Sequence, residues 1–93
     1  MDQIKIGKFI AHKRKEQELT QIQFAELVGV SNKTVSKWET GSRMPDVEII
    51  QDVCDVLKIS VNELLAGEEF AEKEYIKKTI SSRLFMVLYF DGL

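Results

Sequence analysis

The chain is poor in the residues that build cross-linked, metal-binding or catalytic sites. Its one cysteine, Cys54, cannot form an internal disulfide. Cys54 falls among apolar residues at helical spacing, which indicates a reduced core thiol in the cytoplasm rather than a redox sensor. The one histidine, His12, has no cysteine or histidine partners, so we expect no metal site. No nucleophile–base pair, carboxylate pair or phosphate-loop pattern is evident, and we expect neither an enzyme nor a cofactor.

Long apolar segments are also lacking. The continuous apolar run at residues 84–90 is far shorter than the ~20 residues that a membrane-spanning helix needs. The N-terminus shows no leader that combines charge, an apolar stretch and small residues, so we expect no secretion signal. An apolar fraction of 44% is typical of a folded chain, and the length suits one small domain.

The net charge is small, −2, but it is unevenly divided along the chain. Residues 1–43 hold eight Lys and Arg against five Asp and Glu, a balance of +3. Residues 44–67 have a balance of −4, and residues 68–93 a balance of −1. Because affinity for phosphate depends on local charge, the first part could bind nucleic acid although the whole chain is acidic.

The pattern of residues 19–41 predicts two short helices joined by a tight turn. Thr20, followed three residues later by a glutamine, has the spacing of a capping box at a helix start. Gly29 suits the left-handed conformation just past a helix end. Ser31 is an N-cap candidate for the second helix, which carries Trp38 on an apolar face and polar residues elsewhere. This is a helix-turn-helix arrangement.

Further landmarks extend this motif over five segments of the chain at fixed spacings. They are Ile6-Gly7, Arg14, Leu19-Thr20-Gln21, Phe24-Ala25, Leu27, Gly29-Val30-Ser31, Val35-Ser36, Trp38-Glu39, Gly41, Pro45-Asp46, Ile49, Leu57, Val61 and Leu64-Leu65. With these residues the chain resembles the phage-repressor and Cro-type helix-turn-helix family, also called the xenobiotic-response-element family. The resemblance covers roughly residues 4–67 and implies a compact, all-α, five-helix DNA-binding domain.

The second helix of the motif supplies the candidates for reading bases. Asn32 and Lys33 lie at its N-terminal end, which enters the major groove deepest, and Lys37 lies one turn further on. The resemblance implies that these positions contact bases. An asparagine can bond adenine, and a lysine can donate to guanine. Thr34 and Ser36 are secondary candidates, and Thr34 could touch a thymine methyl or a phosphate. The alternative for each residue is an ordinary solvated helix surface.

A second group of residues is expected to hold the DNA backbone. Gln21 opens the first helix of the motif, where its side chain and backbone amide can bind a phosphate, as the glutamine of the family does. Lys13, Thr40 and Arg43 are further phosphate candidates, although many relatives carry a leucine at the position of Lys13. These contacts would fix position without reading sequence.

The resemblance implies that Arg14 and Glu39 pair with each other instead of contacting DNA. A guanidinium that bonds a carboxylate through two N–H groups would lock the second helix of the motif in place. Trp38 is expected in the core, because it shares a face with Val35.

Five helices are predicted over the family-like part of the chain. They run at about residues 4–17, 21–28, 32–39, 46–57 and 61–66. Pro45 and Asp46 favour the start of the fourth helix, and Ser60 and Glu63 have capping-box spacing at the start of the fifth. We therefore expect a DNA-binding domain over residues 1–67.

Residues 68–93 form a tail with a different pattern. An apolar stripe at helical spacing leads into the apolar run at residues 84–90. If the chain is complete, this surface should be buried, most simply against a second copy. We expect a C-terminal helix that packs on a partner chain. A strand is the alternative, and in a longer protein the run could open a membrane helix.

Together these patterns predict a cytoplasmic, DNA-binding transcriptional regulator. We expect a repressor that binds a two-fold operator as a homodimer, with two recognition helices ~34 Å apart in successive major grooves. Two other functions stay open. One is an antitoxin-like protein-interaction module whose tail binds another protein, and the other is the cytoplasmic head of a membrane-tethered sensor.

Overall fold

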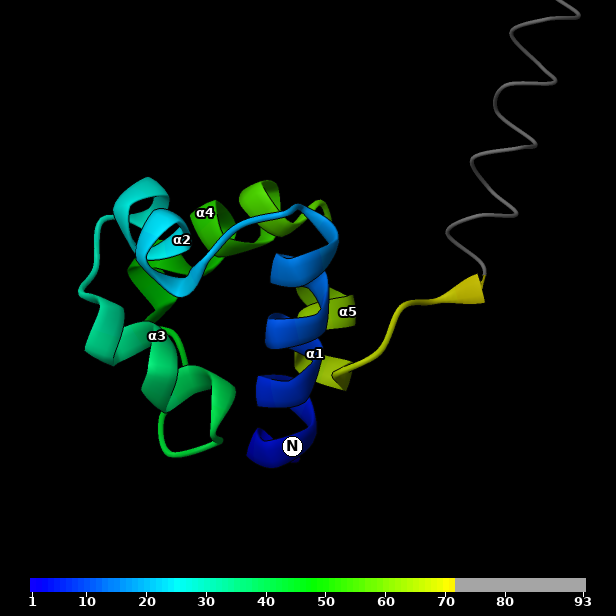
Figure 1. Ribbon diagram of the computed structural model, residues 1–93. Helices are drawn as coiled ribbons and strands as arrows, with labels where there is room; N and C mark the ends of the chain where they lie inside the picture. The colour runs from blue at the N-terminus through cyan, green and yellow to red at the C-terminus, as the bar shows by residue number, and fades with distance from the viewer. Residues whose placement is uncertain (72–93) are drawn as a thin grey trace, which may run out of the picture.

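The computed structural model describes residues 1–71, and within this range the secondary structure consists of five helices without strands (Figure 1). The helices are α1 (Gln3–Glu16), α2 (Gln21–Val28), α3 (Asn32–Glu39), α4 (Val47–Leu57) and α5 (Val61–Ala66). The all-α class and the five predicted helices are confirmed, with ends that differ by at most one residue. The predictions for most of the tail, its conformation and its role in dimerisation, lie outside the described residues.

Local side-chain bonds fix where several helices begin. The side chain of Asp2 accepts the backbone N–H groups of Ile4 and Lys5 at 3.1 Å, which satisfies donors that have no partner inside α1. Both predicted capping boxes, at the starts of α2 and α5, are present. Gly29 ends α2 with a φ of 76°, in the left-handed region that glycine adopts without a steric penalty.

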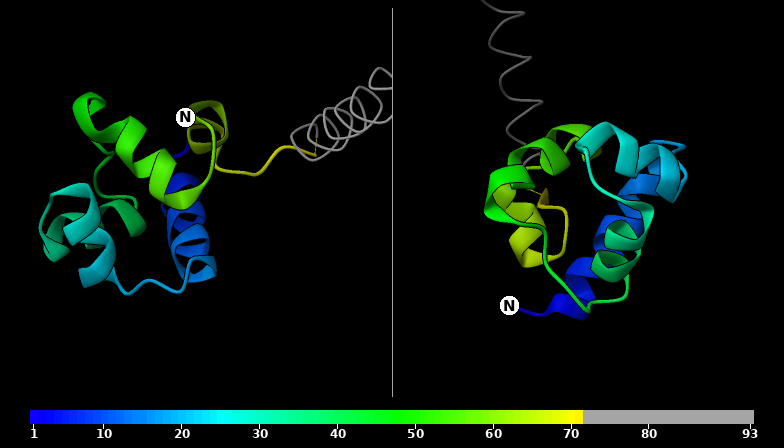
Figure 2. Two further views of the ribbon diagram at one scale, coloured as in Figure 1. Left: turned by 90° about the horizontal axis from the view of Figure 1, so that it is seen from above. Right: turned by 90° about the vertical axis from the view of Figure 1, so that its left-hand side faces the viewer.

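The helices pack around one apolar core. In Figures 1 and 2, α2 and α3 form one side of the domain and α1 and α5 the other, while α4 contacts both groups. Trp38 is buried, as predicted, and meets the ring of Phe24 edge to face, with 6.2 Å between ring centroids. Ala25 is also buried where α2 packs on α3, and its small side chain lets the two helices approach. The core therefore fixes α3 from its inner face.

The apolar stripe of α4 is buried only in part. Val53, Cys54 and Leu57 are buried in its later turns, whereas Val47 is 86% exposed. Helical spacing places Val47 in line with Cys54, so the spacing alone would predict a buried side chain. In the first turn of α4, Ile49 and Ile50 are partly buried against the core, whereas Val47 is turned to solvent.

Candidate nucleic-acid interface

The outer face of α3 carries the three principal candidates for base contacts. Asn32, Lys33 and Lys37 are all exposed, while Val35 and Trp38 on the inner face are buried. Within residues 1–71, no carboxylate lies within ion-pair distance of Lys33 or Lys37. The helix therefore presents two cations and an amide to solvent, while its buried inner face holds it in place.

The first turn of α3 is closed by two hydroxyl groups. Ser31 Oγ accepts the backbone N–H of Thr34 at 3.1 Å, which is the predicted N-cap bond. The hydroxyls of Ser31 and Thr34 also bond each other at 2.9 Å. Thr34 and Ser36 are both half-buried and flank the exposed face. The bond between the two hydroxyls was not foreseen from the sequence.

The N-terminus of α2 has backbone donors that the helix does not use. Thr20 Oγ1 accepts the N–H of Gln23, and the carbonyl of Thr20 accepts the N–H of Phe24. Among the described residues, no acceptor bonds the backbone amide of Gln21 or of Ile22. Two amides at a helix N-terminus are suited to an anion such as a phosphate.

The side chain of Gln21 has a partner that the sequence did not reveal. Its amide nitrogen donates to Glu39 Oε1 at 2.9 Å, which links the start of α2 to the end of α3. The contact engages the side-chain donor that we expected to meet a phosphate. It favours the backbone amide of Gln21 as the phosphate donor and gives the side chain a positioning role.

Arg14 and Glu39 form the expected ion pair between α1 and α3. Arg14 Nε and Nη2 donate to the two carboxylate oxygens of Glu39 at 2.6 and 3.0 Å. The side chains are only 10% and 8% exposed. Arg14 Nη1 also donates to the carbonyl oxygen of Leu19 at 2.7 Å, in the turn before α2. One guanidinium thus ties three elements together through charge-assisted bonds.

The backbones of α1 and α3 approach closely at Gly7. A Cβ atom at this position would overlap the backbone carbonyl oxygens of Trp38 and Glu39. Only glycine leaves room for this approach, because any side chain begins with that atom. The crossing of α1 and α3 is therefore set by Gly7 as well as by the ion pair of Arg14.

The structure corrects the expectation for Lys13. Its side chain is 6% exposed, and its ammonium group pairs with Glu16 at 2.8 Å and with Glu69 at 3.5 Å. Burial disfavours the charged ammonium, but the hydrogen bonds and charges of both glutamates outweigh this effect and raise the pKa of Lys13 above its usual value. A buried and paired ammonium is unsuited to a phosphate contact, so we leave Lys13 out of the candidate interface.

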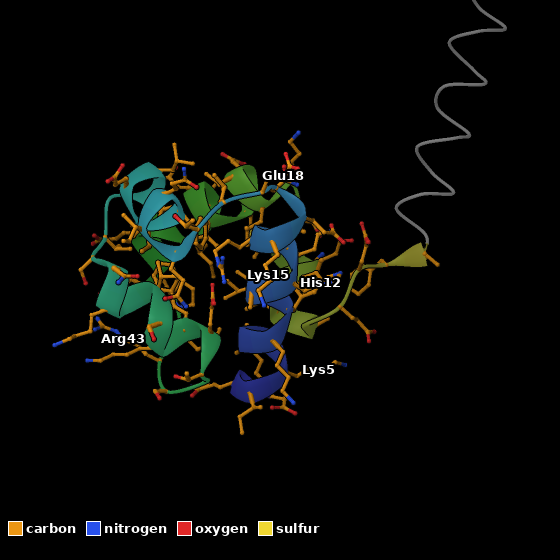
Figure 3. The ribbon with its side chains drawn as sticks, viewed as in Figure 1. Lys5, His12, Lys15, Glu18 and Arg43 are labelled. Carbon is orange, nitrogen blue, oxygen red and sulfur yellow. The ribbon has the colours of Figure 1, made fainter. Side chains whose placement is uncertain are left out.

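The remaining phosphate candidates lie just beyond α3. The Thr40 hydroxyl donates to the carbonyl of Lys37 at 3.2 Å and bonds the Ser42 hydroxyl at 3.1 Å. Arg43 is exposed, and its guanidinium lies 3.7 Å from a carboxylate oxygen of Asp46. Figure 3 shows Arg43 beside α3, whereas Lys5 and His12 lie on the side of α1 turned away from α3. Arg43 thus belongs to the same side of the domain as the exposed face of α3.

Neither Cys54 nor the acidic side chains of residues 1–71 indicate a redox or metal site. Burial raises the pKa of the Cys54 thiol to about 11, with smaller contributions from Asp55 and Glu63, so the thiolate is disfavoured at neutral pH. Within residues 1–71, no group of three or more His, Cys, Asp and Glu side chains is arranged to hold a metal ion. None of the helices in this range combines the length and apolar composition that crossing a membrane requires.

Comparison with known proteins gives the class of this protein. Residues 10–64 match the family described as helix-turn-helix. The chain is 41% identical over 63 residues to the transcriptional regulator YazB of Bacillus subtilis, an alignment that covers 68% of this chain and 91% of YazB. The chain therefore belongs to the helix-turn-helix family of transcriptional regulators, of the phage-repressor and Cro type.

Two other similarities refine this class. The chain is 36% identical over 64 residues to the antitoxin PezA of Streptococcus pneumoniae, which covers 69% of this chain. It spans only 40% of the length of PezA. Its fold is similar to that of the P22 c2 repressor protein, solved in complex with a synthetic operator, with a TM-score of 0.65 and 32% identity. That alignment covers 68% of this chain and 96% of the repressor chain. The fold of this chain is accordingly that of a repressor-type helix-turn-helix domain.

Proposed function

We propose that this protein represses transcription by inserting α3 into the major groove of a specific operator. The observation that carries the proposal is the division of α3 into two faces. The inner face is buried and held by Arg14 and Gly7, and the outer face exposes Asn32, Lys33 and Lys37. A rigid helix with unpaired donors on its outer face is what direct readout of bases requires.

The three exposed side chains divide the readout between them. Asn32 can bond the N6 and N7 edge of adenine, because its amide offers a donor and an acceptor. Lys33 and Lys37 can donate to the O6 and N7 acceptors of guanine. Lys33 and Lys37 lie four residues apart on one face of the helix, so they would contact neighbouring base pairs, and Asn32 would read a base from the N-terminal end of the helix.

The DNA backbone would be held from both sides of α3. The free backbone amides of Gln21 and Ile22 would bind one phosphate at the start of α2. Thr40 and Arg43 would bind another beyond the end of α3, with Arg43 leaving its long contact to Asp46. These contacts depend on salt because bound phosphates release counterions.

The protein would bind its operator as a homodimer in the cytoplasm. A two-fold operator presents two half-sites about one helical turn apart, ~34 Å, and each would take one α3. The apolar run at residues 84–90, outside the described residues, is the proposed contact between copies. In the full chain, Leu84→Glu with Val87→Glu should convert a dimer into a monomer in light scattering. An unchanged molar mass would locate the dimer contact elsewhere.

Selection of binding sites from random DNA tests the function most broadly. The purified full chain should enrich one motif with two-fold symmetry, whose half-site spacing gives the distance between the recognition helices. We expect the matched triple variant Asn32→Ala, Lys33→Ala and Lys37→Ala to remain folded, because all three side chains are exposed, but to enrich no motif. Failure of the natural chain to enrich any motif at low salt would refute sequence-specific binding.

The similarity to PezA supports a second function, in which the protein acts as an antitoxin that also binds a partner protein. The tail would then contact that partner instead of, or as well as, a second copy. Purification of the native complex under mild salt separates the two functions. A stoichiometric second polypeptide would favour the antitoxin, and a homodimer alone would favour the repressor.

A further inference from the structure

Glu63 lies in the first turn of α5, and its side chain reaches both the start of this helix and the segment that follows it. Oε1 accepts the backbone N–H of Ser60 at 2.8 Å, which is part of the capping box. Oε2 accepts the backbone N–H of Phe70 at 2.9 Å, beyond the end of α5. The two oxygens of one carboxylate therefore join the start of the helix to the chain that leaves the domain.

The other capping box of this chain shows that a cap alone does not need a carboxylate. At the start of α2 the equivalent residue is Gln23, whose side-chain oxygen accepts the N–H of Thr20 at 2.9 Å. Glutamine and glutamate can both close a capping box. A glutamine has one acceptor oxygen, however, whereas a glutamate has two. The second oxygen of Glu63 is thus the feature that the bond to Phe70 requires.

The bond to Phe70 is better shielded from water than the ion pairs of the same segment. Glu63 is 0% exposed. The side chains of Glu68 and Glu69, which pair with lysines of α1, are 60% and 56% exposed. Exposed ion pairs contribute little, whereas a buried hydrogen bond to a charged group is strong. Glu63 is therefore the principal attachment of the segment after α5.

We propose that Glu63 is a positioning residue, which fixes the direction in which the chain leaves the domain and thereby the spacing of half-sites that a homodimer accepts. In Figures 1 and 2 the segment after α5 leaves the domain on the side away from α3. The inference rests on the proposed homodimer, in which residues beyond this segment hold the two copies together. With a fixed exit, the two α3 helices meet half-sites at one distance, whereas a loose exit accepts several distances.

Amide hydrogen exchange of the full chain tests the attachment. Glu63→Gln keeps an oxygen for the N–H of Ser60 and places an NH₂ group where Phe70 needs an acceptor. We expect the Phe70 amide of this variant to exchange about tenfold to 100-fold faster than in the natural chain, while the Ser60 amide is unchanged. Glu69→Gln removes the same charge from an exposed side chain, and as the matched control it should alter neither amide.

Two results of this experiment would overturn the inference. In Glu63→Gln, an unchanged Phe70 amide would show that the bond does not hold the segment. Equal acceleration of the Ser60 and Phe70 amides would show that the residue serves only the stability of α5.

Operators with one or two base pairs inserted between the half-sites test the role in spacing. The natural chain and Glu69→Gln should bind these DNAs about tenfold more weakly than the selected operator, and Glu63→Gln only about threefold more weakly. All three proteins should bind a single half-site equally, because α3 is held by Arg14 and Gly7. Equal losses on the inserted DNAs would overturn the role in spacing. If the natural chain selects no operator, the proposed function fails and the role in spacing with it, whereas hydrogen exchange still decides the attachment.

Discussion

Lys13 and Arg14 are adjacent cations in α1, yet they hold different regions of the domain together. Arg14 faces α3 and bonds Glu39 and the turn before α2. Lys13 faces the segment after α5 and pairs with Glu69, while Lys5 pairs with Glu68 of the same segment at 3.1 Å. One region sets the position of α3, and the other fastens the segment after α5 to α1.

The two regions differ in how far water reaches the partner carboxylates. Glu39 is 8% exposed, whereas Glu16 and Glu69 are 44% and 56% exposed. Removing one partner of a buried ion pair is strongly destabilising, because the other charge then stays buried in a low dielectric without a partner. When the partner of a water-exposed carboxylate is removed, water solvates the carboxylate and little stability is lost. The comparison therefore predicts that the stability of the domain depends strongly on the ion pair between Arg14 and Glu39, and little on the pairs that hold the segment after α5.

Removing the Arg14 guanidinium should have the largest effect on stability. Within residues 1–71, Arg14→Ala leaves the buried Glu39 carboxylate with the Gln21 amide as its one partner, and it should lower the free energy of unfolding by about 3–5 kcal/mol. Urea denaturation followed by Trp38 fluorescence measures this loss. Lys5→Ala, which breaks a half-exposed pair, is the matched control and should cost about 0–1 kcal/mol. Equal losses for the two variants would contradict the comparison.

Adding one methyl group at Gly7 should disturb the same region to a smaller degree. Helix propensity favours alanine over glycine by about 1 kcal/mol, but overpacking against the carbonyls of Trp38 and Glu39 costs about 1–3 kcal/mol or more. The clash is with backbone, which cannot rotate away, so we expect Gly7→Ala to destabilise the domain and to weaken operator binding. A variant more stable than the natural chain would show that α1 and α3 can separate at no cost.

Replacing Lys13 by methionine should have the smallest effect. Lys13→Met fills the same space and leaves two half-exposed carboxylates, so we expect a change of about 0–1 kcal/mol in the free energy of unfolding. Operator affinity should stay within twofold, because a buried and paired ammonium is unsuited to a phosphate contact. A tenfold loss on both operator and random DNA would restore Lys13 to the interface.

The difference in stability between the natural chain and Lys13→Met should depend on pH, because the pKa values of Lys13 and Glu16 are shifted in the folded state. Because the pKa of Lys13 is raised in the folded state, its ion pairs contribute to stability below pH 10.5. This contribution is lost as the pH rises through the higher folded-state pKa. The Glu16 pKa is lowered from 4.5, chiefly by the hydrogen bond from Lys13, so its contribution is lost as the pH falls below 4.5. Thermal unfolding from pH 3 to pH 7 should thus show the natural chain and Lys13→Met converging at the acid end.

Local sequence signals predicted the fold well because most helix boundaries have a chemical cause within a few residues. Capping hydroxyls, glycines past helix ends and apolar spacing act over one or two turns, and all are visible in the sequence. The exposure of Val47 was not predictable in this way. It depends on which elements cover the first turn of α4, and that is a property of the assembled domain.

The candidate site was predictable only to the level of which residues share a face. Asn32, Lys33 and Lys37 are exposed together as expected, although their contacts with DNA stay predictions. The bond from Gln21 to Glu39 and the burial of Lys13 join residues that are 18 and 56 positions from their partners. A sequence pattern cannot show such bonds, because they depend on how the helices cross. Helical spacing did offer one unused signal, since Lys13 and Glu16 stand three residues apart.

The central claim is that the outer face of α3 reads sequence, and one ratio tests it most directly. The measurement is the affinity for the selected operator divided by the affinity for random DNA at one salt concentration, for Lys37→Ala and Gln21→Ala beside the natural chain. Lys37→Ala should lower this ratio by about fivefold to 100-fold, because a lost base contact costs about 1–3 kcal/mol only on the cognate site. Gln21→Ala loses the side chain that holds the phosphate-binding start of α2 against Glu39, so it should weaken binding to both DNAs and leave the ratio unchanged. An equal loss on operator and random DNA for Lys37→Ala would contradict the claim.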